Sequence, residues 1–270
     1  MKTSSDTNSN KLISFKWRTK ILIALLLVLF LLLGASFERT TERYAYKFID
    51  FIWSAKSQSE CSESQLLKVQ TRRRQPIRSN DLIETSDDWE VIEKEYAFCP
   101  KNTALLLIDV WETETLKNDV VKAEHNRITN DVIIPIVDKV RNINGIVVHS
   151  PNGSPMYPNI YDNNIDTNLN WTNVLPRKLQ TIILFWKLRS SGIRTLIYAG
   201  FSTNLCLYDR PHGIFFTKLF DDYFTRLLLR DATATWEFSS EQPTVTKNFI
   251  KFLEWHHLPS FLGSEFLESS

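Results

Sequence analysis

From residue 103 onward, short apolar runs alternate with segments of helical periodicity. The runs typical of strands cover residues 104–109, 146–149, 195–199 and 226–230. The helical segments cover residues 130–140, 175–191, 204–220 and 243–255, with Pro211 and Gly213 expected to kink or split the third. Continuous apolar runs suit strands that are covered on both faces. The alternation therefore predicts an α/β domain with a mainly parallel sheet.

The N-terminus has a different character, because residues 21–33 are all apolar and no charge follows before residue 38. The run lies at the short end of the roughly 17–25 residues that span a membrane. Basic residues dominate the lead: Lys2, Lys11, Lys16, Arg18 and Lys20 face only Asp6. The positive-inside rule then keeps residues 1–20 in the cytoplasm and exports the rest.

We expect an uncleaved transmembrane anchor over residues 21–37. A cleaved signal peptide is the alternative, because Gly34, Ala35 and Ser36 suit a peptidase, and the protein would then be secreted after cleavage near Ser36. Either way the body lies outside the cytosol, in a periplasmic, luminal or extracellular space.

Residues 38–98 are predicted to form a juxtamembrane helix, a polar linker and a lead-in to the α/β domain of residues 99–270. Arg72, Arg73 and Arg74 fall in the linker and read as a solvated face or a processing site. An exported body permits a disulfide, for which Cys61 and Cys99 are the candidate pair, and two free thiols are the equal alternative.

Composition excludes several classes of protein. A net charge of +1 argues against a dedicated nucleic-acid binder, which would carry a basic excess. Seven glycines in 270 residues disfavour a glycine-loop phosphate site. We therefore expect a small-molecule ligand and no nucleic acid.

The candidate chemistry lies at the strand ends, because ligands of open parallel sheets bind beyond the carboxyl ends of the strands. Those ends carry Asp109, His149, the turn Gly200-Phe-Ser-Thr-Asn-Leu-Cys206, and Asp231. Cys206 should begin a helix, where the helix dipole lowers a thiol pKa and the N–H groups of residues 202–206 can bind an oxyanion. Asp109 could exchange a proton with this thiol. The plainer interpretation is that Cys206 is a small buried hydrophobic residue.

Four segments together resemble the isochorismatase-like cysteine hydrolases, which include nicotinamidases and N-carbamoylsarcosine amidases. They are residues 106–109, 146–149, 198–206 and 228–233, and the Gly-x-x-Thr-Asn-x-Cys pattern ending at Cys206 is the specific one. The resemblance covers roughly residues 100–268. It implies a three-layer α/β/α sandwich, with Asp109 as general base or acid and Cys206 attacking a carbonyl carbon.

The resemblance also implies details of the turn before the cysteine. A cis peptide is expected between Phe201 and Ser202, with Thr203, Asn204 and Leu205 completing the oxyanion turn.

The sequence departs from the family pattern at three points. An ungapped count puts Asn173 at the position of the family lysine, and Lys178, a weak candidate, comes later inside a predicted helix. Arg177 and Arg210 are the other cations that could serve. Trp111 replaces a glutamine. The metal-binding Asp and His cluster of nicotinamidases is missing, so no metal or other cofactor is expected.

Two hypotheses follow. The first is a membrane-anchored cysteine hydrolase that cleaves a small amide through a Cys206 thioester, with Trp111, His149, Tyr157 and Trp171 lining the pocket. The second is a catalytically degenerate family member that acts as a tethered binding or scaffold protein. Relatives often form dimers or tetramers, so a homo-oligomer is compatible with both.

Overall fold

The computed structural model describes residues 61–76, 89–151, 155–158, 160–162, 166–168, 177–235, 242–256 and 258–269. The predicted cytoplasmic tail, the apolar segment of residues 21–37 and the juxtamembrane helix lie outside these residues. Within the described ranges, no helix combines the length and the apolar character that crossing a membrane requires.

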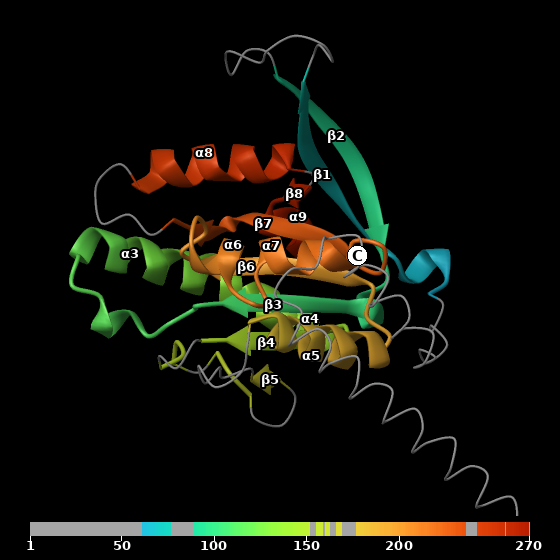
Figure 1. Cartoon of the computed structure of the whole chain (residues 1–270), viewed down its shortest axis with the longest axis horizontal. Coiled ribbons are helices and arrows are strands. Elements are labelled where there is room, and N and C mark those ends of the chain that lie inside the picture. Colours follow the sequence, from blue (N-terminus) through green and yellow to red (C-terminus); the bar gives the residue numbers. More distant parts are fainter. Residues whose placement is uncertain are drawn as a thin grey trace, which may run out of the picture. The chain divides into compact units, whose positions relative to one another are not determined.

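Strands and helices alternate along most of the described chain (Figure 1). The strands are β1 (Leu67–Pro76), β2 (Trp89–Phe98), β3 (Thr103–Ile108), β4 (Ile146–Ser150), β5 (Thr167–Asn168), β6 (Thr195–Phe201), β7 (Thr225–Ala234) and β8 (Ser260–Phe261). The helices are α3 (Asp119–Ile128), α4 (Ile134–Asn142), α5 (Arg177–Ser190), α6 (Cys206–Asp209), α7 (Ile214–Thr217), α8 (Gln242–Trp255) and α9 (Gly263–Glu268). The four predicted strands are confirmed as β3, β4, β6 and β7.

The strands form one eight-stranded sheet in the order β2-β1-β8-β7-β6-β3-β4-β5. All neighbours from β8 through β5 pair in parallel, whereas β1 runs antiparallel to both β8 and β2. Strand β3 pairs with β4 on one side and with β6 on the other. Its central place explains why every residue of β3 is buried.

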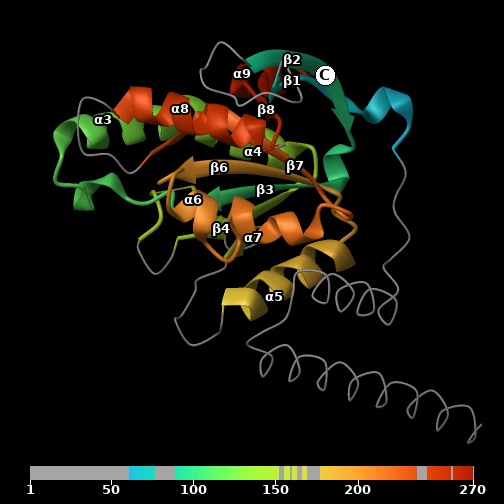
Figure 2. The same ribbon diagram turned by 45° about the horizontal axis from the view of Figure 1, so that its top comes forward.

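Helices cover both faces of this sheet (Figure 2). Leu105 and Leu107 belong to the core cluster that includes Ile136 of α4 and Phe266 of α9. On the opposite face, Tyr198 of β6 forms a 2.6 Å hydrogen bond with Thr217 of α7. The arrangement is the α/β/α sandwich that the sequence predicts. Burying each large apolar side chain in it contributes about 1.5–3 kcal/mol.

Residues 67–98 differ from the prediction of a linker and a lead-in. They form the β1–β2 hairpin, paired along its length from Leu67 opposite Phe98 to Pro76 opposite Trp89. The Arg run hides the strand pattern: Leu67, Val69 and Thr71 are buried on one face of β1, which continues with the exposed Arg73, whereas Arg72 and Arg74 lie on the other face. Arg72 and Arg74 are not simply solvated.

Two of the arginines bind one buried carboxylate of α8. Glu254 has no exposed side-chain area and accepts hydrogen bonds from Arg72 Nε at 2.6 Å and Arg74 Nε at 3.0 Å. The Ser260 hydroxyl of β8 donates to the same carboxylate at 2.6 Å. A buried carboxylate needs such partners, because an unpaired charge in the interior is costly. The hairpin is thereby fixed to the domain.

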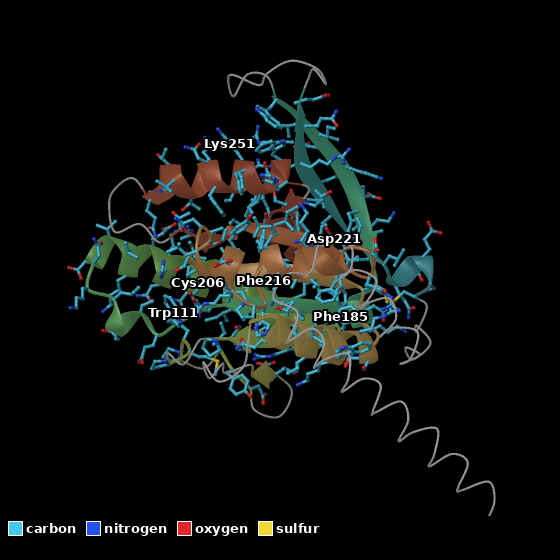
Figure 3. All side chains as sticks on the ribbon, in the orientation of Figure 1. Trp111, Phe185, Cys206, Phe216, Asp221 and Lys251 are labelled. Carbon is cyan, nitrogen blue, oxygen red and sulfur yellow. A yellow bond between two sulfur atoms is a disulfide. The ribbon has the colours of Figure 1, made fainter. Side chains whose placement is uncertain are left out.

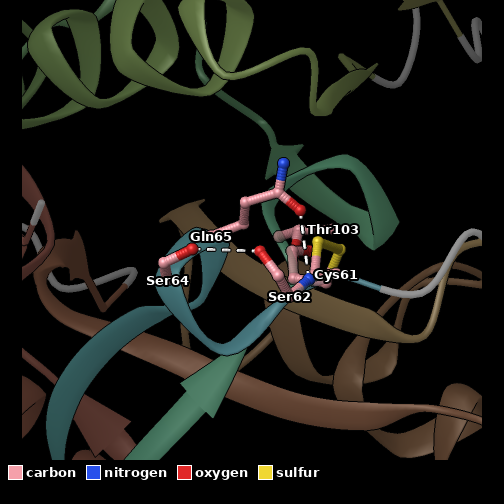
Figure 4. The surroundings of a disulfide bond; sticks show 6 residues. Cys61, Ser62, Ser64, Gln65 and Thr103 are labelled. Atoms are coloured by element: carbon pink, nitrogen blue, oxygen red, sulfur yellow. Dashed lines mark hydrogen bonds between the residues drawn. A yellow bond between two sulfur atoms is a disulfide. The ribbon is translucent and has the colours of Figure 1, made fainter.

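A disulfide joins Cys61 to Cys99, as Figure 4 shows. It links the residues that precede β1 to the residue that follows β2. The carbonyl of Cys99 accepts a 2.8 Å hydrogen bond from the Thr103 hydroxyl at the start of β3. The bond therefore closes the base of the hairpin, and Cys206 is the remaining free cysteine of the three.

Two predicted helices also differ in extent. The helix predicted from residue 130 begins at Asp119, where the Asn118 side chain caps it, and a π-helical turn over Thr129–Ile133 joins α3 to α4. The helix predicted over residues 204–220 is split, as expected, into α6 and α7 around Pro211 and Gly213.

Candidate active site

The site forms where β3 and β6 end side by side. Ile108, the last residue of β3, is paired with Gly200 in β6, so the segments that follow diverge from one point. Gly200 has a φ of 123°, and a Cβ there would lie 2.0 Å from the Ile108 carbonyl oxygen. Only glycine permits this close approach. Figure 3 shows Cys206 and Trp111 toward this end of the sheet, and Phe185 and Asp221 toward the other.

Two non-glycine residues in the site have left-handed backbone. Asp109 has a φ of 53° and Ser202 a φ of 56°. Such residues cost on the order of 1 kcal/mol or more and concentrate at functional sites. The described backbone contains no cis peptide, so the expected cis bond between Phe201 and Ser202 is absent. The positive φ of Ser202 turns the chain instead.

The turn uses part of the hydrogen-bonding capacity that was expected to serve an oxyanion. The Thr203 N–H donates to the Ala234 carbonyl at 3.0 Å, and the Leu205 N–H donates to the Ser202 carbonyl at 2.9 Å. The Thr203 hydroxyl also contacts that of Thr233. These bonds fix the turn on β7, and they remove Thr203 and Leu205 as backbone donors to a ligand.

Three side chains, those of Asp109, Cys206 and Arg210, converge at the turn. Arg210 Nη2 lies 3.3 Å from Asp109 Oδ2 and 3.4 Å from Cys206 Sγ. Asp109 is fully buried, whereas the Arg210 side chain remains 25% exposed. Among the described residues, Asp109 Oδ1 has no hydrogen-bond partner. The arrangement is a thiol and a carboxylate bridged by one guanidinium nitrogen.

Arg210 is therefore the cation beside this thiol and carboxylate, where a lysine was expected. It follows Cys206 by one turn of α6, and residues at that spacing lie on the same face of a helix. This spacing is the sequence signal that identifies it. Lys178 falls in α5, but its side chain is outside what the structure describes, as are all atoms of Trp171.

The protonation states differ from those predicted. The pKa of the Cys206 thiol is raised to about 11: burial is the largest cause, the Asp109 carboxylate adds to it by repulsion and by accepting the thiol hydrogen bond, and Arg210 opposes both. The predicted helix dipole has little effect, because α6 spans only Cys206–Asp209. Burial also raises the pKa of Asp109, against the opposing charge of Arg210. The resting thiol is therefore protonated at neutral pH.

Trp111 closes one side of the site. Its indole N–H donates to the Pro151 carbonyl at 3.0 Å, and its backbone forms an isolated bridge with Met156. A hydrogen bond from Trp111 also helps to lower the pKa of Asp109, although by less than burial raises it. The indole of Trp111, where a glutamine was expected, thus places an N–H group near the carboxylate.

The predicted pocket residues His149 and Tyr157 are engaged elsewhere. His149 Nε2 lies 3.0 Å from Asp166 Oδ2, and Arg141 Nε donates to Asp166 Oδ1 at 3.2 Å. His149 is thus part of a buried polar network with Asp166 and Arg141. The Tyr157 hydroxyl accepts a 2.9 Å hydrogen bond from Asn130 Nδ2.

Two other buried histidines contact the residues that end β4 and β6. His212 Nδ1 lies 3.1 Å from the Ser150 hydroxyl, and burial lowers the pKa of His212 to about 3. His125 of α3 stacks on Phe201 with 3.8 Å between ring centroids, and burial lowers its pKa to about 4. Sequence patterns gave no sign of this stacking. Both imidazoles are neutral at pH 7. Within the described ranges, no group of three or more His, Cys, Asp or Glu side chains is placed to hold a metal ion.

Comparisons with known proteins give structural neighbours only. No protein-family model matches the chain, and no curated protein matches it. Among solved structures, a cysteine hydrolase from Pseudomonas syringae pv. phaseolicola 1448A is 14% identical with a TM-score of 0.47, covering 63% of this chain and 92% of its own.

Two further solved structures have the same level of identity. An isochorismatase family protein from Desulfovibrio vulgaris subsp. vulgaris str. Hildenborough is 14% identical with a TM-score of 0.44, covering 60% of this chain and 95% of its own. The YcaC gene product of Escherichia coli, described as an octameric hydrolase of unknown specificity, is 14% identical with a TM-score of 0.41, covering 62% and 78%. The chemistry of this site is therefore inferred from its own side chains.

Proposed function

We propose that residues 99–270 form a cysteine hydrolase that cleaves the C–N bond of a small amide through a thioester on Cys206. The observation that supports this most directly is the Arg210 guanidinium, 3.4 Å from the Cys206 sulfur and 3.3 Å from the Asp109 carboxylate. A nucleophile, a proton acceptor and a cation at one strand end are the parts that nucleophilic catalysis requires.

In the first half-reaction, Cys206 sulfur attacks the amide carbonyl carbon while its proton moves to Asp109. The tetrahedral intermediate then breaks its C–N bond, and Asp109 returns the proton to the leaving nitrogen. The products are a free amine and a thioester. Because the proton moves as the bond forms, the thiol with its pKa near 11 does not have to ionise beforehand.

In the second half-reaction, water attacks the thioester carbonyl carbon and gives one proton to Asp109. The C–S bond breaks, a carboxylic acid leaves, and the proton returns to the Cys206 sulfur. The raised pKa of Asp109 suits this carboxyl group to carry a proton in both steps. Arg210 stabilises the negative charge as it passes between carboxylate and sulfur.

The proposal is tested by hydrolysis of a panel of small amides with the full chain, Cys206→Ala and Asp109→Asn. We expect Cys206→Ala to lose at least about 10³-fold in turnover. Acid-quenched reactions of the native protein should show an acyl group on the Cys206 peptide by mass spectrometry. Turnover by Cys206→Ala at the native rate would exclude the mechanism.

A second candidate is a catalytically degenerate protein that binds a ligand at this site without turnover. The raised pKa of Cys206 favours this alternative, because it makes the resting thiol a weak nucleophile. The absence of any acyl adduct, together with saturable binding of a small amide, would support this candidate.

We further propose that residues 21–37 anchor the protein in a membrane with the α/β domain on the extracytoplasmic side. The apolar run and the basic lead support this proposal. Extraction of membranes at alkaline pH tests it, because a spanning segment stays with the lipid whereas a cleaved product is released. A homo-oligomer of the domain is a further proposal, which light scattering tests.

A further inference from the structure

Arg210 has more hydrogen-bonding capacity than its contacts in the site use. A guanidinium carries five N–H donors. Both contacts are made by Nη2, to Asp109 Oδ2 and to Cys206 Sγ. Among the residues that the structure describes, Nε and Nη1 of Arg210 have no acceptor within hydrogen-bond distance. Two nitrogens of the guanidinium are therefore available to a ligand.

The charged group of this site that is open to a ligand is the guanidinium of Arg210. The Arg210 side chain is 25% exposed, whereas Asp109 is fully buried behind it. The imidazole of His212 adds no charge, because burial keeps it neutral at pH 7. Electrostatic attraction is stronger at such a partly desolvated group than in bulk water. The accessible surface of the site therefore favours an anion.

The backbone holds this cation at a fixed place beside the nucleophile. The Arg210 N–H donates to the Cys206 carbonyl at 3.1 Å, and the Arg210 carbonyl accepts from the Gly213 N–H at 2.7 Å. Because Nη1 and Nη2 share one carbon atom, an anion on Nη1 lies close to the atom that the sulfur attacks. An anionic group one bond away from that atom fits this separation.

We propose that the substrate of Cys206 is a small amide whose scissile carbonyl carbon is bonded directly to a carboxylate group, which Nη1 of Arg210 binds. This inference rests on the proposed function, because it assumes that Cys206 is the nucleophile. It adds a substrate class that the nucleophile alone does not determine. Arg210 then has two roles, as the cation of the catalytic group and as the carboxylate receptor.

The test compares two alkylating agents of equal size. Iodoacetate and iodoacetamide share a leaving group and an attacked carbon, and only iodoacetate carries a carboxylate. Cys206 is the free cysteine of the three, so intact mass reports its alkylation alone. The ratio of the two rate constants, divided by the same ratio for the uncharged thiol 2-mercaptoethanol, cancels the thiolate fraction and the intrinsic reactivities.

We expect this normalised ratio to be roughly tenfold above one for the full chain at low salt. It should fall as NaCl is added, because salt screens the attraction. Arg210→Met should bring it close to one, and Arg210→Lys should retain part of it. Lys101→Met is the matched control, since it removes one positive charge from the exposed residue before β3, at the opposite end of that strand, and should leave the ratio unchanged.

A normalised ratio of one in the native chain, or an elevated ratio that survives Arg210→Met, would overturn the inference. If Arg210→Met fails to fold by circular dichroism, the salt titration of the native chain decides instead. The outcome is independent of turnover. If hydrolysis requires Cys206 but Cys206 does not prefer iodoacetate, only the inference about the carboxylate is refuted. If Cys206 prefers iodoacetate but no amide is hydrolysed, the proposed reaction is refuted.

Discussion

Replacing Asp109 with Asn should lower the pKa of Cys206 and speed its alkylation at neutral pH. Burial is the largest cause of the raised thiol pKa, followed by repulsion from the Asp109 carboxylate and the hydrogen bond that this carboxylate accepts from the thiol. Arg210 acts in the opposite direction. The Asp109→Asn substitution would leave burial in place and remove the negative charge, so Arg210 would favour the thiolate without a carboxylate opposing it.

Two opposing effects set the change in alkylation rate: the thiolate fraction rises, and the nucleophilicity of each thiolate falls. With a pKa of about 11, roughly one thiol in 10⁴ is ionised at pH 7. Removing a like charge at contact distance lowers a pKa by about one unit or more, which raises the thiolate fraction tenfold per unit. A less basic thiolate is also a weaker nucleophile, which takes back about threefold per unit. We therefore expect alkylation at pH 7 to be roughly three to ten times faster.

The assay follows the rate of iodoacetamide addition to Cys206 from pH 6 to 11 by intact mass. Iodoacetamide is uncharged, so the rate reports the thiol and not recruitment of an anion. Arg210→Met gives the opposing control, because loss of the cation should raise the pKa and slow the reaction. A native inflection near 8.5, the value of a free thiol, would refute the reasoning. So would an Asp109→Asn variant that reacts more slowly than the native chain.

Three further predictions concern stability. Glu254→Gln should destabilise the domain by about 2–4 kcal/mol in urea unfolding, because it breaks the buried contacts with the hairpin arginines, whereas Glu95→Gln, which loses only an exposed pair, should cost under about 0.5 kcal/mol. Asp166→Asn should cost about 2 kcal/mol at pH 7: burial alone would raise the pKa of Asp166, but hydrogen bonds from a histidine and an arginine lower it to about 2. A carboxylate with a depressed pKa stabilises the fold above its unfolded pKa near 4, so this difference should shrink between about pH 4 and pH 2. Replacing Cys61 and Cys99 with serine should cost up to about 4 kcal/mol, because the bond spans 38 residues, and an unchanged urea midpoint would show that the bond does not form.

The parallel part of the sheet and the pairing of Asp109 with Cys206 were predictable from sequence. Buried parallel strands are apolar throughout, so β3, β4, β6 and β7 are visible as short runs. Adjacent parallel strands end at one edge of the sheet, which brings together residues that lie far apart in the chain. Arg210 was one of three candidate cations, and its place one helical turn after Cys206 separates it from the other two.

The β1–β2 hairpin was not predictable by the same means. Its arginines resemble a solvated run until their partner is known, and Glu254 lies 182 residues beyond Arg72. The direction of the Cys206 pKa shift was also not predictable from sequence. The position of Cys206 at a helix start suggested a lowered pKa, but the helix is one turn long and burial dominates.

Because Arg210 follows Cys206 closely in the chain, the site does not depend on a cation from another element. A cation supplied by a separate element would require that element to be placed independently of the nucleophile. Here α6 begins at Cys206 and Arg210 is the residue that caps its C-terminus, so the two are held by the same short stretch of backbone. A Cβ on Gly213 would lie 2.7 Å from the Leu207 carbonyl oxygen, so the chain can fold back to bind the Arg210 carbonyl only with glycine at this position. The thiol therefore has a positive partner without the lysine that was expected, because a single turn of backbone carries Cys206 and Arg210 to the buried carboxylate.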